Sequence, residues 1–150
     1  MQTRQQQDAL RALKDTQEIL EKEEEFKKSY AIAVHRFPFL VRQNGLQQTL
    51  AFYAGKAHAK KQENEQDETN TAEGKFLDHI LTSLNLSETG YVDILEALAK
   101  TDLQSYMRHT RRCLELALWY RRFVESVLKV DATGNPIELT ENKGENSASN

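Results

Sequence analysis

Residues 26–61, FKKSYAIAVHRFPFLVRQNGLQQTLAFYAGKAHAKK, carry the pattern that decides the fold. Large apolar side chains recur in this stretch at steps of three and four residues, which is the spacing of one helix face. They are Tyr30, Val34, Phe37 and Val41 in the first half, and Leu46, Leu50, Tyr53 and Ala57 in the second. Pro38 predicts a break, with a new short helix beginning at the proline. Asn44 or Gly45 favours the end of that piece, because either can adopt the left-handed conformation found at helix C-termini.

The segments on either side of this stretch also have helical periodicity. Residues 4 to about 25 predict a polar helix with a sparse apolar stripe. The stripe consists of Leu10, Leu13, Ile19 and Leu20. After an acidic linker at about 61–71, Asn70 and Glu73 have the spacing of a capping box. The helix that they open is expected to bury Phe76, Leu77, Ile80, Leu81 and Leu84.

The last part of the chain predicts a short helix and a long one. The short helix covers residues 91–100, and its apolar residues are Val92, Leu95 and Leu98. Thr101 and Gln104 have capping-box spacing and open the longest helix, which ends at about Lys129. The sequence therefore predicts an all-α protein, a single small bundle of five or six helices over residues 1–129. The tail at 130–150 is expected to be disordered.

The composition is that of a soluble globular protein, with 150 residues, 39% hydrophobic and 29% charged. No apolar run approaches the roughly 20 residues that a bilayer requires, and the N-terminus lacks the apolar core of a signal peptide. The single cysteine, Cys113, excludes an internal disulfide and fits a reducing compartment. We expect a cytoplasmic protein that does not contact a membrane.

Charge is distributed in blocks that the net charge of −3 hides. Residues 26–61 contain seven Lys or Arg residues and no Asp or Glu. Residues 62–103 carry ten acidic and two basic groups, and residues 104–129 carry six basic and two acidic groups. The alternation indicates opposed basic and acidic surfaces. Because salt-bridge partners are absent from the acid-free stretch, phosphates or an acidic protein are expected to complete its surface. The rival interpretation is that the acidic linker screens it within the chain.

The longest predicted helix has a basic stripe opposite its apolar face. The stripe consists of Arg108, Arg111, Arg112 and Arg122. The expected core face consists of Leu103, Tyr106, Cys113, Leu114, Ala117, Val124 and Leu128. Trp119 falls among the arginines, which is typical of a stacking or docking surface. Glu115 lies inside the stripe, where it can pair with Arg111 or Arg112.

An ordinary helix surface is the alternative interpretation of the same stripe. Basic residues late in a helix interact favourably with its dipole, and Arg121–Glu125 is a common i, i+4 pair. Trp119 is then covered by the N-terminal helix.

Residue types suited to catalysis or metal binding are scattered. His35, His58, His79 and His109 form no HExxH motif and no Cys/His cluster, so no metal site is predicted. Cys113 falls on the apolar face of its helix, which favours a buried, inert thiol over a nucleophile. The chain has no Gly-rich phosphate loop. The sequence therefore predicts neither an enzyme nor a cofactor.

Residues 36–53, RFPFLVRQNGLQQTLAFY, resemble the signature of the small helical subunit of the type III-B CRISPR effector, the Cmr complex. Members of that family carry a helix ending near a proline, an apolar pair, then Arg–x–Asn–Gly–Leu and an apolar-aromatic helix. Here these are Pro38, Phe39 and Leu40, then Arg42, Asn44, Gly45 and Leu46, then Leu50, Ala51, Phe52 and Tyr53. Residues 106–125, YMRHTRRCLELALWYRRFVE, resemble the last helix of the family.

The resemblance implies a non-enzymatic scaffold. Copies of such a subunit stack head to tail into a minor filament beside the backbone subunits and flank the duplex of guide RNA and target RNA. Its partners are the other Cmr subunits, especially the backbone and large subunits, together with copies of itself and both RNAs. Target cleavage in such complexes belongs to the backbone subunit, and second-messenger synthesis belongs to the large subunit.

The residues expected to contact RNA follow from charge and wheel position alone. They are Lys27, Lys28, Arg42, Lys56, Lys60, Lys61, Arg108, Arg111, Arg112 and Arg122, with Trp119 as a stacking or docking residue. The alternative function is a helical adaptor whose basic face docks an acidic protein. RNA contact predicts a steep loss of affinity with salt, whereas a mainly hydrophobic adaptor docking through Trp119 predicts a weak one.

Overall fold

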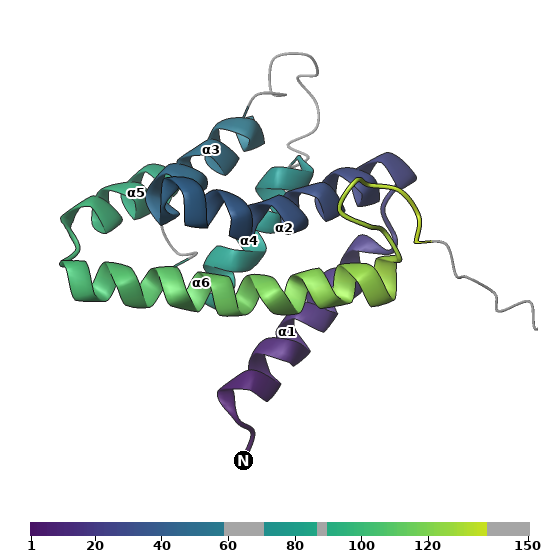
Figure 1. Ribbon diagram of the computed structural model, residues 1–150, viewed down its shortest axis with the longest axis horizontal. Helices are drawn as coiled ribbons and strands as arrows, with labels where there is room; N and C mark the ends of the chain where they lie inside the picture. The colour runs from purple at the N-terminus through teal and green to yellow at the C-terminus, as the bar shows by residue number, and fades with distance from the viewer. Residues whose placement is uncertain (59–70, 87–89, 138–150) are drawn as a thin grey trace, which may run out of the picture.

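The computed structural model describes residues 1–58, 71–86 and 90–137. They form six α-helices, namely α1 (Arg4–Ile19), α2 (Glu24–Asn44), α3 (Leu46–His58), α4 (Ala72–Ser83), α5 (Tyr91–Lys100) and α6 (Leu103–Phe123). A π-helical turn, Val124–Leu128, continues α6. In Figure 1, α6 runs along the length of the molecule, α1 crosses it and extends beyond it, and α5 lies at the end where α6 begins. The predicted all-α bundle is confirmed.

The centre of the bundle is a cluster of aromatic rings around Phe76 of α4. Its ring centroid lies 5.8 Å from that of Tyr30 and 5.3 Å from that of Phe37, both on α2. Tyr53 of α3 lies at 6.0 Å and Tyr120 of α6 at 5.7 Å. All five residues are at most 2% exposed. Four helices therefore meet on one phenyl ring, and burial of these large apolar surfaces is a major contribution to the stability of the bundle.

Helix α2 continues through Pro38, so the predicted break at the proline is wrong. A proline inside a helix removes one N–H donor, which here leaves the carbonyl of Val34 without its usual partner. Burial of Pro38 in the bundle helps to offset this cost. The Tyr53 hydroxyl also donates to the neighbouring carbonyl of Ala33 at 2.5 Å. The predicted end of the segment is confirmed at Gly45, whose φ of +84° favours glycine.

Helix α1 ends well before the predicted boundary at 25, and α2 begins after a turn. Its predicted apolar stripe is also wrong in part, because Leu10 and Leu20 are each 42% exposed. The buried face instead includes Ala12 and Thr16, whose small side chains let α1 lie close to the bundle. The Thr16 hydroxyl is satisfied within the helix by the Ala12 carbonyl at 2.7 Å. Close packing therefore selected a different face from the one that hydrophobicity indicated.

Both predicted helix caps, Asn70 and Thr101, lie one residue before the caps of the structure. Asp102, not Thr101, caps α6 by accepting the backbone N–H of Ser105 at 2.8 Å. Thr101 ends α5 instead, and its hydroxyl bonds back to the carbonyl of Ala97. A carboxylate accepts more strongly than a hydroxyl at a positively polarised helix N-terminus, which explains the choice of Asp102.

The cap of α4 is Thr71, whose hydroxyl accepts the N–H of Gly74 at 3.1 Å. The predicted cap, Asn70, lies outside the described residues. Gly74 is required for packing, because a Cβ there would lie 2.8 Å from the Cβ of Ala57 on α3. Helices α3 and α4 therefore approach each other more closely at this point than two larger residues would permit.

Two predicted core positions near the end of the bundle are exposed. Leu103 at the start of α6 is 73% exposed and Val92 of α5 is 76% exposed. Leu116 and Tyr120 of α6 are fully buried instead, and Ile94 takes the core position on α5. The buried face of α6 is therefore rotated from the predicted one, which lies directly opposite the arginine stripe.

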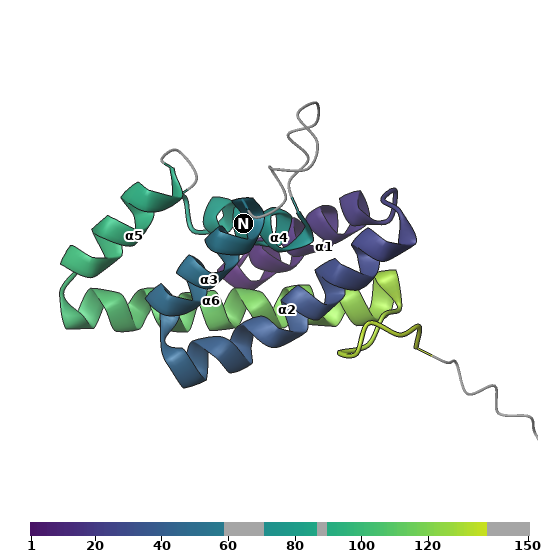
Figure 2. The same ribbon diagram turned by 90° about the horizontal axis from the view of Figure 1, so that it is seen from above.

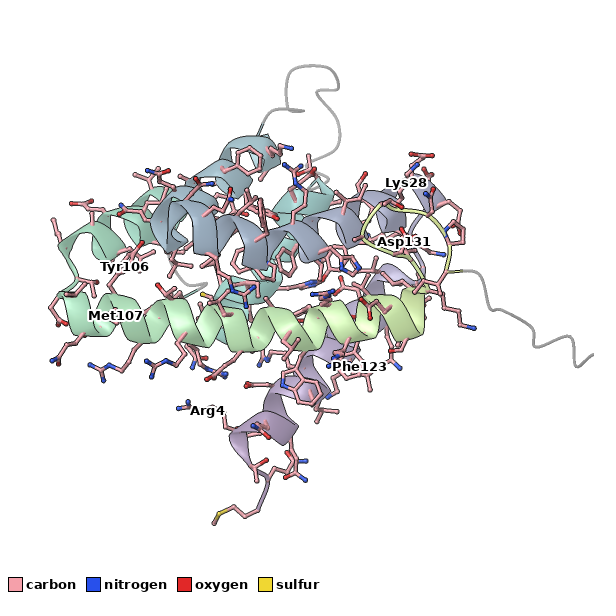
Figure 3. All side chains as sticks on the ribbon, viewed as in Figure 1. Arg4, Lys28, Tyr106, Met107, Phe123 and Asp131 are labelled. Carbon is pink, nitrogen blue, oxygen red and sulfur yellow. The ribbon has the colours of Figure 1, made fainter. Side chains whose placement is uncertain are left out.

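The chain continues beyond α6 into a turn that packs on α2. Asp131 accepts the backbone N–H groups of Thr133 and Asn135, and hydrogen bonds from these two residues lower the pKa of its carboxyl group. A Cβ on Gly134 would lie 2.6 Å from Cγ of Lys28, and the φ of +82° at this residue also favours glycine. Figure 3 shows Lys28 and Asp131 on neighbouring segments. Of the tail expected to be disordered, residues 130–137 form this turn and 138–150 lie outside the described residues.

A search of the described residues finds no helix with the length and apolarity needed to cross a bilayer. This agrees with the composition, in which charged residues interrupt every apolar run.

Candidate nucleic-acid interface

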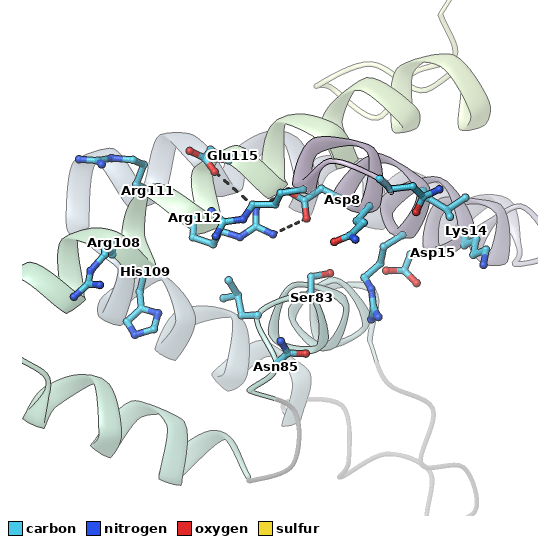
Figure 4. A pocket seen from close by; sticks show the side chains of 16 residues that line it. Asp8, Lys14, Asp15, Ser83, Asn85, Arg108, His109, Arg111, Arg112 and Glu115 are labelled. Carbon is cyan, nitrogen blue, oxygen red and sulfur yellow. Dashed lines mark hydrogen bonds and ion pairs between the residues drawn. The ribbon is translucent and has the colours of Figure 1, made fainter.

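An open groove of about 1090 Å³ lies between α1 and the first half of α6, with the C-terminal end of α4 at its base. Figure 4 shows the groove from close by, with side chains from all three elements converging on it. Six of the lining residues are Arg or Lys, and three are acidic. The cations are Arg4, Arg11, Lys14, Arg108, Arg111 and Arg112, and the acids are Asp8, Asp15 and Glu115. The groove therefore carries an excess of positive charge.

Arg112 is neutralised by acidic neighbours and holds the two walls of the groove together. Its two terminal nitrogens each donate to one oxygen of Asp8 at 2.5 Å, which makes the pair bidentate. Glu115 lies 3.7 Å from the same guanidinium, as the dashed lines in Figure 4 indicate. The hydrogen bond with Asp8 raises the pKa of Arg112. Arg112 is therefore a structural link between α1 and α6, and Glu115 pairs with it as the sequence predicted.

The other five cations have no such partner. Within the described part of the chain, no carboxylate oxygen lies within 4.0 Å of Arg4, Arg11, Lys14, Arg108 or Arg111. Arg108 and Arg111 are exposed, and in Figure 4 both extend from α6 away from the Arg112–Asp8 pair. Five cationic side chains with free hydrogen-bond donors can bind a row of anionic groups.

A chain of hydrogen bonds lies beneath the groove and joins two of its lining residues, Asp15 and Ser83, through the buried Tyr120. The Tyr120 hydroxyl donates to Asp15 at 2.6 Å and lies 3.1 Å from the Ser83 hydroxyl. Burial, together with the Asp15 carboxylate, raises the pKa of Tyr120 well above its ordinary value. Tyr120 thus remains a neutral donor, and this bond positions α1 against α6 and α4.

Comparison with known proteins gives a family for this fold. A family model described as CRISPR-associated protein (Cas_Cmr5) matches residues 4–127. The chain belongs to the Cmr5 family. A protein of Thermus thermophilus named CRISPR system Cmr subunit Cmr5 is 32% identical over 94 residues, which are 63% of this chain and 70% of that protein.

A crystal structure of a Cmr5 family protein from the same organism superposes with a TM-score of 0.67 at 27% identity. The match covers 85% of this chain and 99% of that one. The Cmr5 fold thus accounts for nearly the whole bundle described above. The family resemblance found in residues 36–53 and 106–125 is confirmed.

Only part of the predicted RNA-contacting set lies in the groove of this Cmr5 family member. Arg108, Arg111 and Arg112 line it, and Arg122 is exposed at the last turn of α6 outside it. Lys60 and Lys61 lie outside the described residues. The groove therefore combines most of the predicted arginine stripe with cations that the prediction did not include.

The remaining predicted residues lie on α2 and α3. Lys27 pairs with Glu24 at 3.1 Å, and the Lys28 stem packs against the C-terminal turn. Lys56 lies over the ring of Phe52, 4.7 Å from its centroid. Arg42 is exposed in the last turn of α2. These cations are spread over two helices and do not gather at one site.

Within the described part of the acid-free stretch, one of the Lys and Arg residues, Lys27, has a salt-bridge partner, and the acidic groups near the stretch come from outside it. Glu24 pairs with Lys27, and Glu125 lies 4.0 Å from Nδ1 of His35. These acids reach the stretch from the first turn of α2 itself and from the π-helical turn after α6.

The cations of α1 were missed because charge was counted by segment. Residues 1–25 are acidic overall, yet Arg4, Arg11 and Lys14 are seven and three residues apart and share one helix face. A helical wheel of α1 would have revealed this face. The groove itself could not have been found in this way, because its second wall lies about a hundred residues further along the chain.

Trp119 and Cys113 of α6 differ in their burial. Trp119 is half-buried and stacks on Phe123, with centroids 6.0 Å apart and ring planes 19° apart. It does not line the groove, and a docking role for it stays a prediction.

Cys113 is fully buried, and burial raises the pKa of its thiol to about 12. This confirms the predicted inert thiol.

His79 lies beside two carboxylates that the sequence did not connect with it. Asp15 and Glu18 come from α1, about sixty residues away along the chain. No metal site was predicted, because the search of the sequence looked for local His and Cys spacing.

Proposed function

We propose that this chain is a non-catalytic structural subunit of a type III-B CRISPR effector and binds RNA phosphates in the α1–α6 groove. Its copies stack head to tail into a minor filament that flanks the duplex of guide RNA and target RNA. Membership of the Cmr5 family supports a place among the Cmr subunits. The observation that carries the RNA contact is the set of five unpaired cations in the groove, counted over the residues that the structure describes.

The chemistry of the groove fits a phosphate backbone better than a protein carboxylate cluster. Arginine presents a planar fork of donors that matches phosphate oxygens, and three of the five unpaired cations are spaced along α1 rather than gathered at a point. Binding releases the counterions condensed on the nucleic acid. For each single-strand phosphate that is neutralised, the logarithm of the binding constant therefore falls by about 0.7 for every tenfold rise in salt concentration.

A pull-down from the native host tests the assembly. The chain is tagged and recovered with and without ribonuclease treatment, and the proteins and RNA that accompany it are identified. The proposal expects the other Cmr subunits, particularly the backbone and large subunits, together with RNA of guide length. Recovery of unrelated acidic proteins without RNA would support the adaptor alternative instead.

A charge-reversal pair tests the groove within the purified effector. Arg108→Glu with Arg111→Glu changes two unpaired groove cations, whereas Arg121→Glu with Lys129→Glu makes the same charge change outside the groove, near the end of α6. We expect the groove variant to lose at least roughly tenfold in RNA affinity and to have a smaller salt slope. Equal losses in both variants would show an effect of net charge alone and contradict the groove.

A further inference from the structure

Asp15 and Glu18 of α1 and His79 of α4 bring three potential metal ligands together at one point. One ligand atom from each residue lies within 4.8 Å of the other two. Nε2 of His79 is 3.5 Å from Oε2 of Glu18 and 4.0 Å from Oδ1 of Asp15. These separations are slightly wider than those between adjacent ligands of a bound ion, so small side-chain movements would close them.

The imidazole of His79 points into this cluster with an unsatisfied nitrogen. The residue is 7% exposed, and Nε2 has no hydrogen-bond partner among the described residues. Nδ1 lies 2.7 Å from the Tyr30 hydroxyl. Buried polar atoms are nearly always paired, yet the nearest acceptor offered to Nε2, Oε2 of Glu18, lies 3.5 Å away, at the outer limit of a hydrogen bond. A cation between the three groups would pair Nε2 at a shorter distance and relieve the repulsion between the carboxylates.

We propose that Asp15, Glu18 and His79 bind a divalent transition-metal ion of the zinc class. Imidazole nitrogen with carboxylate oxygens is a donor set that such ions accept, and three protein ligands leave a position for water. Burial lowers the pKa of His79, so its ring is neutral at pH 7 and offers a lone pair. Glu18 is half-exposed and leaves the ion a path from solvent.

The groups around the ligands have the arrangement of a second shell. The Tyr120 hydroxyl donates to Oδ2 of Asp15 at 2.6 Å, which leaves Oδ1 for the ion. In the tautomer that binds metal through Nε2, Nδ1–H of His79 donates to the Tyr30 oxygen, which lies 2.7 Å away. Lys75 opposes binding, because its Nζ lies 2.7 Å from Oε1 of Glu18. The ion would take the other oxygen, Oε2, at a reduced affinity.

An ion at this site would join α1 to α4. Asp15 also lines the α1–α6 groove, so the ion would hold one wall of the groove in place. The inference does not depend on RNA binding, because it concerns only the affinity of the folded chain for metal.

Calorimetric titration with Zn²⁺ tests the site on the full chain, freed of any histidine tag and dialysed against a chelator. We expect one ion per chain. His79→Gln and Glu18→Gln should each weaken binding at least roughly tenfold, since even changes to second-shell partners cost that much. Lys75→Met should tighten binding by roughly tenfold, because it removes a positive charge next to Glu18. His35→Gln is the matched control, since His35 also has an unpaired, buried Nε2 but lies outside the cluster of three ligands.

Two results would overturn the proposal. One is the absence of Zn²⁺ binding by the unmodified chain, and the other is unchanged binding in Glu18→Gln. Circular dichroism establishes that each variant is folded. If His79→Gln does not fold, Glu18→Gln and Lys75→Met still decide, because both alter partly exposed side chains.

Discussion

The aromatic cluster around Phe76 and the contact of α1 with α6 are two regions of one bundle that are held by different interactions. Rings from three other helices pack directly on Phe76. Helix α1, which Figure 2 shows from above, adds directed polar contacts to its buried Ala12 and Ile19, namely the Asp8–Arg112 pair and the Asp15–Tyr120 bond. The first region depends on apolar area, and the second combines apolar area with directed polar contacts. Substitutions in the two regions should therefore differ in size and in response to pH and salt.

The largest effect is expected at the aromatic centre. Phe76→Ala removes a ring that contacts four others and leaves a cavity, which should lower the free energy of unfolding by about 4 kcal/mol. Phe39→Ala is the control, because Phe39 is 57% exposed and the same change there should cost less than about 0.5 kcal/mol. Urea unfolding followed by circular dichroism measures both. Similar losses in the two variants would mean that the cluster is not the centre of stability.

Asp8→Ala tests the attachment of α1. Asp8 and Arg112 side chains are 11% and 20% exposed, so removing the carboxylate leaves a largely buried guanidinium with only Glu115 nearby among the described acids. We expect the free energy of unfolding to fall by about 2 kcal/mol, which is less than the cost of breaking a completely buried ion pair. The double variant Asp8→Ala, Arg112→Ala should lose less than the sum of the two single changes. Additive losses would indicate that the two side chains do not interact.

Lower pH should weaken the bundle through its two buried histidines. Burial lowers the pKa of His79 and of His35 below the ordinary value of 6.5, and nearby carboxylates oppose this only in part. The unfolded chain therefore binds more protons in this range than the folded one. The free energy of unfolding should have its full value above about pH 6.5. Below that pH it should fall by up to about 1.4 kcal/mol per pH unit for each histidine.

Urea unfolding between about pH 7.5 and 5.0, a range that spans the ordinary histidine pKa, measures this loss. His79→Gln should reduce the slope of stability against pH, leaving the contribution of His35. Glu18 does not obscure the result, because the hydrogen bond from Lys75 lowers its pKa and places its titration at more acidic pH. An unchanged slope in the variant would contradict the assignment to His79.

Local patterns predicted the aromatic region, and they could not predict the α1–α6 region. The spacing of Tyr30, Phe37 and Tyr53 showed which faces are buried, because helical periodicity depends only on near neighbours. Asp8 and Arg112 are 104 residues apart, and nothing near either residue in the sequence indicates the other. The resemblance to a known family also predicted the fold and a functional class, which local patterns alone could not have done.

The errors within single helices have a similar cause. Pro38 remains inside α2 and is buried there, and a local rule for proline does not include tertiary contacts. Leu10 was placed in the core because it is apolar, whereas the bundle contacts α1 through its small residues. Tertiary packing decided both cases against the local preference.

The smallest effect is expected from an ion pair that resembles Asp8–Arg112 in chemistry alone. Arg121 and Glu125 lie 3.4 Å apart at i, i+4 spacing, and their side chains are 52% and 39% exposed. Water solvates both charges and salt screens them, so Arg121→Ala should cost only about 0.3 kcal/mol. Added salt should remove even this loss, while the loss in Asp8→Ala persists because that pair is shielded from solvent. Unfolding at low and high ionic strength separates the two pairs, and equal salt sensitivity would show that the burial of Asp8 does not strengthen its bond to Arg112.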